Sequence, residues 1–392
     1  MRIVDIREQA IPISRFLDPV LPSGGLTTSI VAVITDIQRN GQPIIGYGFS
    51  SFGRYGQSGL IRERFAPRLV ASTADLATPD HYHLDPRRAW TAMMQGEKPG
   101  GHGERCVAVG TLDMAIWDAA AKIADLPLYR FLTDRLGSVL PEQPAEKPQV
   151  PVYASGGYLY PLGDLTHLGD EIRQGLDRGH TDFKIKIGTV SQAKDLQRID
   201  TVLKLLPGPG HLAVDAMNSY GHEDALRMAS VLAPVGLRWF EDPCDPLDFE
   251  TLADIARLYK RPLGVGEALF SLAEAKLLHR HGGLRPVHDI LQFDPVHCYG
   301  LTHYLDIVAT MEAAGWQRNT FFPHGGHLFA LHIVAALGLG GCEDNPCAFQ
   351  PFGGFADETV IAAGKAAPPD LPGIGFEGRA ELMKILQRVG GV

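Results

Sequence analysis

The sequence lacks the features that mark several large classes of protein. Its 392 residues contain no apolar run of about 18 residues, so we expect no membrane span. Lys and Arg form no cluster, and the net charge of −9 with a pI near 5.9 argues against a nucleic-acid-binding surface. The N-terminus lacks the long apolar core of a signal peptide.

Cysteine is also scarce. Its five copies are odd in number, scattered and without metal-ligand spacing: Cys106, Cys244, Cys298, Cys342 and Cys347. Reduced thiols in a cytoplasmic enzyme are the simplest interpretation of this pattern. The length and the hydrophobic content of 45% predict a globular chain with a large core and two domains.

The first part of the chain indicates a small α+β domain. Apolar strands at 30–35 and 43–48 flank a turn at 39–42, and its Asn-Gly dipeptide favours a hairpin. Residues 107–124 carry apolar side chains at helical spacing. We interpret the Gly-rich stretches 18–26 and 50–59 as mobile, functional loops, and the polar stretch 138–149 as the linker that leaves this domain.

From residue 150 onward, short apolar strands alternate with helices. We expect strands at 151–155, 183–187, 212–215, 239–241, 263–267, 290–293, 320–323 and 338–343. Eight strands with regular crossovers fit a (β/α)8-type barrel. A Gly/Pro-rich segment, 350–375, and a last helix at 377–389 follow, and we expect this helix to pack back on the first domain. The expected boundaries are 1–140, 150–349 and 350–392.

Three carboxylates end successive barrel strands at an even spacing. Asp215, Glu241 and Glu267 lie 26 residues apart and then 26 again, and a strand with its returning helix takes about 25 residues. Adjacent parallel strands would bring the three acids together at one mouth of the barrel. Because converging carboxylates repel one another, and oxygen ligands suit a hard ion, the spacing predicts a Mg²⁺ site.

Two lysines on the second barrel strand, Lys184 and Lys186, face the same way because side chains alternate along a strand. Two adjacent ammonium groups lower each other's pKa, and a nearby metal lowers it further, which makes a lysine a general base. The alternative is a solvated pair at a sheet edge. The three acids on the next strands favour the functional interpretation.

Asp294 and His324 end the next two strands. A carboxylate on one strand can orient an imidazole on its neighbour, which makes His324 an acid/base candidate opposite the lysines. His327 is the competing histidine, but it starts the following helix and is expected to point away. Glu343 ends the last strand, where it either hydrogen-bonds a substrate carboxylate in its protonated form or serves as a structural acid.

This ordered set of lysines, acids and histidine resembles the enolase superfamily, mandelate racemase subgroup, over essentially the whole chain. The resemblance implies a modified (β/α)7β TIM barrel with an N-terminal α+β capping domain that the C-terminal segment completes. It implies that Asp215, Glu241 and Glu267 bind Mg²⁺, which holds a substrate carboxylate and stabilises an enediolate. It further implies that Lys186 is the base, that Lys184 helps to hold the carboxylate, and that His324, oriented by Asp294, protonates the departing β-hydroxyl.

Several stretches resemble the D-tartrate dehydratases of this superfamily more closely: 40–47, 53–57, 96–105 and 370–378. By this resemblance Lys98 contacts the distal carboxylate of a diacid, and Tyr55 and Asn218 are further candidate substrate contacts. Two positions depart from the expected pattern. Met217 stands where the superfamily usually has Asn, with Asn218 following it, and Phe52 stands in a stretch where tartrate dehydratases carry a small amide.

The sequence therefore predicts a cytoplasmic, Mg²⁺-dependent acid-sugar dehydratase, with tartrate as the leading hydroxy-diacid substrate. A racemase or epimerase that uses Lys186 and His324 as opposed bases is the enzymatic alternative, and so is a dehydratase of another sugar acid. A non-catalytic sugar-acid binding protein is the alternative from another class, although binding alone needs no base. The resemblance also implies a homo-oligomer, with no nucleic-acid or membrane partner.

Overall fold

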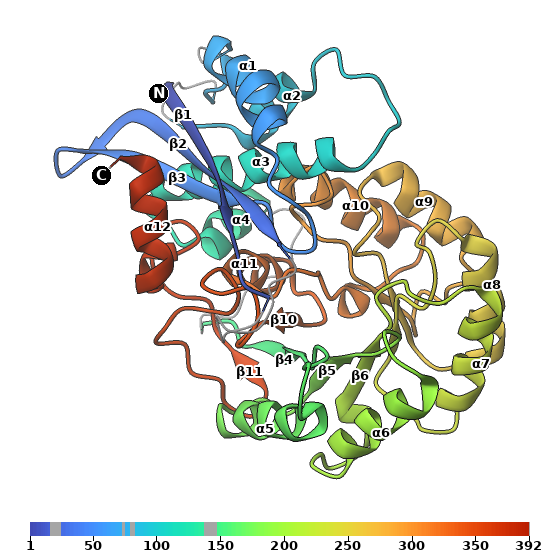
Figure 1. Ribbon diagram of the computed structural model, residues 1–392. Coiled ribbons are helices and arrows are strands. Elements are labelled where there is room, and N and C mark those ends of the chain that lie inside the picture. Colours follow the sequence, from blue (N-terminus) through green and yellow to red (C-terminus); the bar gives the residue numbers. More distant parts are fainter. Residues whose placement is uncertain (16–24, 73–74, 79–82, 137–146, 392) are drawn as a thin grey trace.

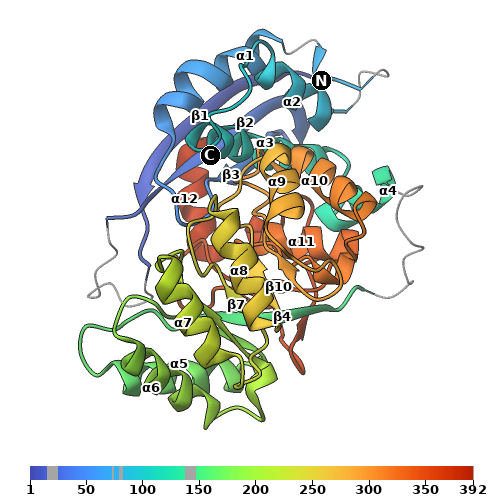
Figure 2. The same cartoon turned by 90° about the vertical axis from the view of Figure 1, so that its right-hand side faces the viewer.

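The computed structural model describes residues 1–15, 25–72, 75–78, 83–136 and 147–391. It has two parts, a small α+β cap and a larger barrel of alternating strands and helices (Figure 1). Turned by 90°, the cap lies over one end of the barrel (Figure 2). Most of the two stretches interpreted as a mobile loop at 18–26 and a linker at 138–149 lies outside the described residues.

The described elements of the cap run from the N-terminus to residue 136, and they are β1 (Ile3–Pro12), β2 (Thr27–Arg39), β3 (Gln42–Phe49), the π-helix Leu60–Phe65, α1 (Ala66–Ala71), α2 (Pro86–Met94), α3 (Glu104–Ile123) and α4 (Leu128–Leu136). The barrel elements are β4 (Val150–Gly156), α5 (Asp164–Asp177), β5 (Phe183–Lys186), α6 (Gln192–Leu203), β6 (Leu212–Asp215), α7 (His222–Leu232), β7 (Phe240–Glu241), α8 (Phe249–Tyr259), β8 (Leu263–Val265), α9 (Leu272–His281), β9 (Ile290–Leu291), α10 (Leu301–Ala313), α11 (Leu328–Leu337) and β10 (Cys342–Asp344). The return segment contains β11 (Lys365–Ala366) and α12 (Ala380–Gly390), and short 3₁₀ turns lie at Pro209–His211, Arg318–Thr320 and Phe376–Gly378.

The cap is a three-stranded antiparallel sheet covered by α3. The expected hairpin is confirmed as β2 and β3, and Asn40 and Gly41 at its turn both take positive φ, 54° and 76°. A Cβ on Gly46 would lie 2.0 Å from the Ala115 carbonyl oxygen, so only glycine lets β3 approach α3 this closely. The first strand, β1, was not expected, because this edge strand is charged and lacks a clear apolar alternation.

The C-terminal helix returns to the cap. Helix α12 lies against β1 and β2 (Figure 1). Arg7 of β1 donates from Nη1 to the Gly390 carbonyl at 2.7 Å. This return is part of the expected fold, whereas the numerical domain boundaries stay predictions.

The barrel follows the expected (β/α)7β order with one correction. Residues 320–323 were expected as the seventh strand, but there the structure has only a 3₁₀ turn and an isolated parallel bridge between Leu291 and Phe321. Pro323 has no N–H to extend this ladder. Two hydrogen bonds still close the ring: the Phe322 amide donates to the Leu291 carbonyl at 2.9 Å, and the Gly340 amide donates to the Phe321 carbonyl at 3.0 Å.

The cap contacts the barrel through α3 and the segment that follows β9. A Cβ on Gly110 would lie 1.7 Å from the Val296 carbonyl oxygen, and Asp113 accepts from the amide and hydroxyl of Thr302 at 3.0 and 2.7 Å. The cap helix thus fixes the chain beside Asp294. Among the described residues, no helix is both long and apolar enough to cross a membrane.

Candidate active site

The strand register brings the expected acids together at one mouth of the barrel. In the parallel ladders, Lys186 pairs with Asp215, and Asp215 pairs with Glu241. Glu267 lies two residues beyond the end of β8, the strand that pairs with β7. One carboxylate oxygen of each acid lies within 4.8 Å of the others. The three acids that are spaced by 26 residues in the sequence thus lie side by side in the structure, as we expected.

The residues of this acid cluster fit a hard divalent cation. The donor set consists of carboxylate oxygens only, which is the ligand type that Mg²⁺ prefers. Glu267 Oε2 is buried and accepts no hydrogen bond from the described residues, and its ion-pair contact is His324 Nε2 at 3.6 Å. The Met217 amide donates to Asp215 Oδ1 at 2.7 Å, which orients that carboxylate. Met217, the first departure from the expected pattern, therefore acts here through its backbone.

Lys184 and Lys186 are both buried and both face the acid cluster. Lys184 Nζ lies 2.5 Å from Glu241 Oε1 and 3.0 Å from Glu343 Oε1, and Lys186 Nζ contacts Asp215 Oδ2. Burial by itself lowers the pKa of Lys186, but the Asp215 carboxylate outweighs it and holds this pKa above its usual range. Lys184 lowers the pKa of Lys186, as expected, but in the protein without a bound cation this effect is smaller than that of Asp215.

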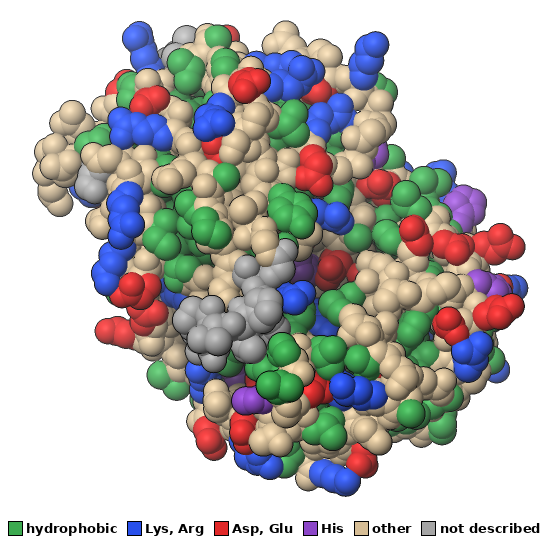
Figure 3. Space-filling model, in the orientation of Figure 1, with side chains coloured by type: hydrophobic (Ala, Val, Ile, Leu, Met, Phe, Trp, Pro, Cys, Tyr) green, Lys and Arg blue, Asp and Glu red, His purple; other side chains and the backbone are tan. Residues whose placement is uncertain are grey.

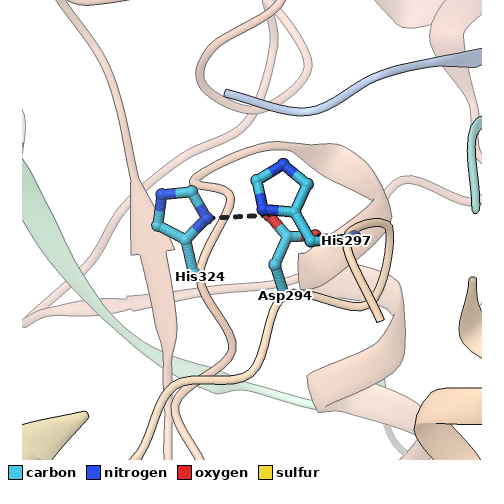
Figure 4. A group of neighbouring side chains, drawn as sticks. All are labelled: Asp294, His297 and His324. Atoms are coloured by element: carbon cyan, nitrogen blue, oxygen red, sulfur yellow. Dashed lines mark hydrogen bonds and ion pairs between the residues drawn. The ribbon is translucent and has the colours of Figure 1, made fainter. Parts of the chain in front are cut away.

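Asp294 and His324 form the expected pair (Figure 4). His324 Nδ1 lies 2.7 Å from Asp294 Oδ2, and its Nε2 lies 3.6 Å from Glu267 Oε2. Burial lowers the pKa of His324, yet the Glu267 carboxylate and the bond to Asp294 raise it to about 10. In the protein without a bound cation, these carboxylates favour the protonated imidazole at neutral pH, which is the form that a general acid requires.

Glu343 shares Lys184 with the acid cluster, because Lys184 Nζ contacts both Glu343 and Glu241. Besides its ion pair with Lys184, its Oε2 accepts from the Gly325 amide at 3.1 Å. Burial alone raises the pKa of this carboxyl group, but Lys184 and His324 hold it well below its usual range. Of the two roles considered, the ionised, structural one is favoured over a protonated hydrogen-bond donor.

Two residues near the pair were not singled out from the sequence. His297 is 2% exposed, and its Nδ1 lies 3.7 Å from Asp294 Oδ2. Neither of its ring nitrogens has a hydrogen-bond partner in the part of the chain that the structure describes. Its ring packs edge-on against Phe270 with centroids 5.4 Å apart. The second residue is Arg54 of the cap loop. Its guanidinium lies over the same Phe270 ring, 4.7 Å from the ring centroid, so a cation of the cap borders the site. The sequence held two signals for these residues: His297 follows the end of a barrel strand, and Arg54 lies in the 50–59 stretch that we interpreted as a functional loop.

Among the described residues, no hydrogen bond or ion pair joins the side chains of three expected substrate contacts, Lys98, Tyr55 and Asn218, to the acid cluster, the two lysines or His324. Lys98 is exposed, and its carbonyl accepts from Arg105 Nη1 at 2.9 Å; the segment that carries it stands away from the barrel (Figure 1). Tyr55 is 60% exposed. Asn218 donates from Nδ2 to the Cys244 carbonyl at 2.8 Å. Their roles as substrate contacts stay predictions.

Phe52, the second departure from the expected pattern, is part of the core. It is 1% exposed, and its ring stacks on Phe349 with centroids 4.4 Å apart and an interplanar angle of 10°. It also meets the His327 ring edge-on at 5.6 Å. The loop is thereby fixed to the barrel. The space-filling view shows a hollow between cap and barrel in which acidic, basic and histidine side chains reach the surface (Figure 3).

Comparison with known proteins agrees with this geometry. Residues 167–382, more than half of the chain, match the family described as enolase C-terminal domain-like. The chain belongs to the enolase superfamily. The crystal structure of L-talarate dehydratase from Polaromonas sp. JS666, complexed with Mg and L-glucarate, superposes with a TM-score of 0.69 at 27% identity and covers 95% of this chain and 94% of that one.

Two curated relatives are sugar-acid dehydratases. L-talarate/galactarate dehydratase of Salmonella typhimurium is 28% identical over 352 residues, which make up 89% of this chain and 81% of the relative. Arabinonate dehydratase of Saccharolobus solfataricus is 26% identical over 283 residues, 71% of each chain. The relatives thus support an enzyme of the acid-sugar dehydratase type.

Proposed function

We propose that this enolase-superfamily protein is a Mg²⁺-dependent dehydratase of sugar diacids, with D-tartrate, converted to oxaloacetate, as the leading substrate. The observation that carries the proposal is the placement of a lysine and a histidine around one acid cluster. Lys186 contacts Asp215, and His324 Nε2 lies 3.6 Å from Glu267, another member of that cluster. A base and an acid that flank one bound substrate suit an elimination of water.

In this reaction Lys186 Nζ takes the proton from the carbon next to the substrate carboxylate, and Lys184 helps to hold that carboxylate. His324 Nε2 then gives its proton to the β-hydroxyl, so that the C–O bond breaks and water leaves. The resulting enol becomes a 2-keto acid. Asp294 keeps the proton of His324 on Nδ1 and holds the ring in place.

Asp215, Glu241 and Glu267 would hold the Mg²⁺ ion. When bound, it would supply the positive charge that neutralises these carboxylates and the developing charge on the substrate carboxylate. Each acid is positioned by its own strand, and the Met217 amide keeps Asp215 oriented.

Asp215→Asn should weaken Mg²⁺ binding at least tenfold, because it removes one of three charges from an oxygen-only site. Isothermal titration of the metal-stripped protein measures this, and activity should return to the wild type, but not to the variant, when Mg²⁺ is restored. Asp224→Asn is the matched control, since Asp224 pairs with Arg227 on the exposed face of α7. Equal Mg²⁺ affinity in wild type and Asp215→Asn would contradict the assignment.

We favour a diacid over a monoacid as the substrate because a cation of the cap loop borders the site beyond the Asp294–His324 pair. Arg54 lies over Phe270, which in turn contacts His297, and no described carboxylate forms an ion pair with this guanidinium. An unpaired guanidinium suits a second substrate carboxylate. Lys98 was the cation expected from the sequence; its side chain is exposed, and its role as a contact to the distal carboxylate stays a prediction.

Assays of D-tartrate, galactarate, talarate and the monoacid arabinonate for 2-keto acid, with the optical rotation of D-tartrate followed in parallel, test the function. Arg54→Gln should raise KM for the diacid about 10- to 100-fold and leave any monoacid turnover unchanged, since a hydrogen bond to a charged group is worth about 1.5–3 kcal/mol. Arg62→Gln, a largely exposed arginine near Glu8, is the control. Keto acid from the monoacid alone would contradict the diacid assignment, and loss of rotation without keto acid would indicate a racemase.

A further inference from the structure

A serine of the cap reaches the catalytic pair of the barrel. Ser51 follows β3 and is completely buried. Its Oγ donates to Asp294 Oδ2 at 2.6 Å, the same oxygen that accepts from His324 Nδ1 at 2.7 Å. Ser51 takes a φ of 57°, a left-handed conformation that is uncommon for residues other than glycine. The loop therefore bends sharply at the residue that touches Asp294.

The histidine thought to point away lies behind this serine. His327 begins α11, and its Nδ1 accepts from the Ala330 amide at 3.4 Å, which places the ring proton on Nε2. That Nε2 lies 3.3 Å from Ser51 Oγ. With the His327 N–H donated to the serine oxygen, the serine O–H is left to donate to Asp294. The expectation that His327 points away from the site is thus wrong.

The Asp294 carboxylate has two candidate imidazole partners. Its Oδ1 accepts from the amides of Val296 and His297 at 2.6 and 3.2 Å, which fixes one edge. Its Oδ2 faces His324 at 2.7 Å, but also His297 Nδ1 at 3.7 Å. A second hydrogen-bond donor to Oδ2 fixes the orientation of the Asp294 carboxylate relative to these two imidazoles. Ser51 is that donor, and it comes from the other domain.

The cap holds Ser51 firmly on both sides. The preceding Ser50 amide donates to the Ser29 carbonyl and to Thr28 Oγ1, both at 3.1 Å. The following Phe52 stacks on Phe349 of the segment after β10. The serine hydroxyl is thus presented to Asp294 by a loop that is tied to the cap sheet and to the barrel.

We propose that Ser51 is a positioning residue that, with His327 behind it, directs Asp294 toward His324 rather than His297. His324 then presents Nε2 to the leaving hydroxyl. In this proposal the cap contributes a hydrogen bond that orients the Asp294–His324 pair of the barrel, in addition to covering the substrate site. This proposal rests on the dehydratase function proposed above.

Ser51→Ala should separate the two halves of the reaction. Serine and alanine both carry a Cβ, so the cost of the positive φ is the same and only the hydroxyl is lost. Elimination of water should fall about 10- to 100-fold in kcat with KM nearly unchanged, whereas exchange of the substrate α-proton with solvent deuterium should continue. Ser51→Gly, which suits the positive φ, repeats the test should the alanine variant fold poorly.

Ser50→Ala is the matched control. Ser50 is the adjacent buried serine, and its Oγ contacts Thr111 Oγ1 at 3.0 Å and the Ser29 carbonyl at 3.5 Å, within the cap. It should leave both exchange and elimination at wild-type rates. Equal losses of exchange and elimination in Ser51→Ala, or no loss in either, would overturn the proposal.

A second arm does not depend on turnover. In protein with ¹⁵N-labelled histidine, the proton that His324 Nδ1 donates to Asp294 should give a strongly downfield NMR signal, and His327 should report the Nε2–H tautomer. The downfield signal should shift or broaden in Ser51→Ala and stay in place in Ser50→Ala. If the wild type dehydrates no sugar acid, the proposed function fails, and this arm alone judges Ser51: an unchanged signal in Ser51→Ala overturns its role.

Discussion

Replacement of Lys186 by alanine is expected to stop both product formation and exchange of the substrate α-proton with solvent deuterium. A positioned acid or base is typically worth about 10²–10⁴-fold in rate. Both readouts should fall together because proton abstraction precedes the loss of water. The measurement follows ²H incorporation by NMR and keto-acid formation in the same sample, with Mg²⁺ present.

Lys186→Arg tests whether the lysine acts as a base or only as an ion-pair partner. Arginine keeps the positive charge beside Asp215 but cannot be deprotonated at neutral pH. It should therefore be as inactive as the alanine variant while keeping wild-type thermal stability. In the protein alone Asp215 raises the pKa of Lys186. Charge supplied to Asp215 by a bound cation acts in the opposite direction. Near wild-type turnover in either variant would show that another group is the base.

His324→Asn should abolish keto-acid formation and yet permit α-proton exchange. The base that starts the reaction is Lys186, whose contacts with Asp215 do not involve the histidine. The departing hydroxyl, in contrast, loses its proton donor. We expect elimination to fall about 10²–10⁴-fold, with exchange retained within roughly tenfold.

The same experiment separates a dehydratase from a racemase. If Lys186 and His324 were opposed bases, the wild type would invert the substrate, optical rotation would vanish at constant substrate mass, and no keto acid would form. His222→Asn serves as the control, because this histidine starts α7 on the outside of the barrel and is expected to have no effect. A His324→Asn variant that still forms keto acid at the wild-type rate would remove the histidine from the mechanism.

The sequence by itself determined the parts that depend on local patterns and on even spacing. The Asn-Gly turn specifies the hairpin of β2 and β3, because both residues tolerate positive φ. The 26-residue ladder predicts Asp215, Glu241 and Glu267 on adjacent strands, because each βα unit has a nearly constant length and parallel strands keep their register. The alternation along β5 turned both lysines toward these acids.

The tertiary structure decided what depends on distant segments meeting. Ser51 and Asp294 lie 243 positions apart in sequence, and no local sequence pattern predicts that the Ser51 hydroxyl donates a hydrogen bond to the Asp294 carboxylate. The same holds for Arg54 of the cap loop, which lies over Phe270 of the barrel. The placement of a loop side chain follows from packing over the whole cap–barrel interface, for which periodicity carries no information.

Protonation states were likewise decided only by the folded structure. The neighbouring Lys184 and a metal suggested a lowered pKa for Lys186, but in the protein without a bound cation the contact with Asp215 outweighs the effect of Lys184. Glu343 was open between a protonated and an ionised form until Lys184 was found 3.0 Å away. A pKa sums burial and every nearby charge, and those distances exist only once the strands have closed into the barrel.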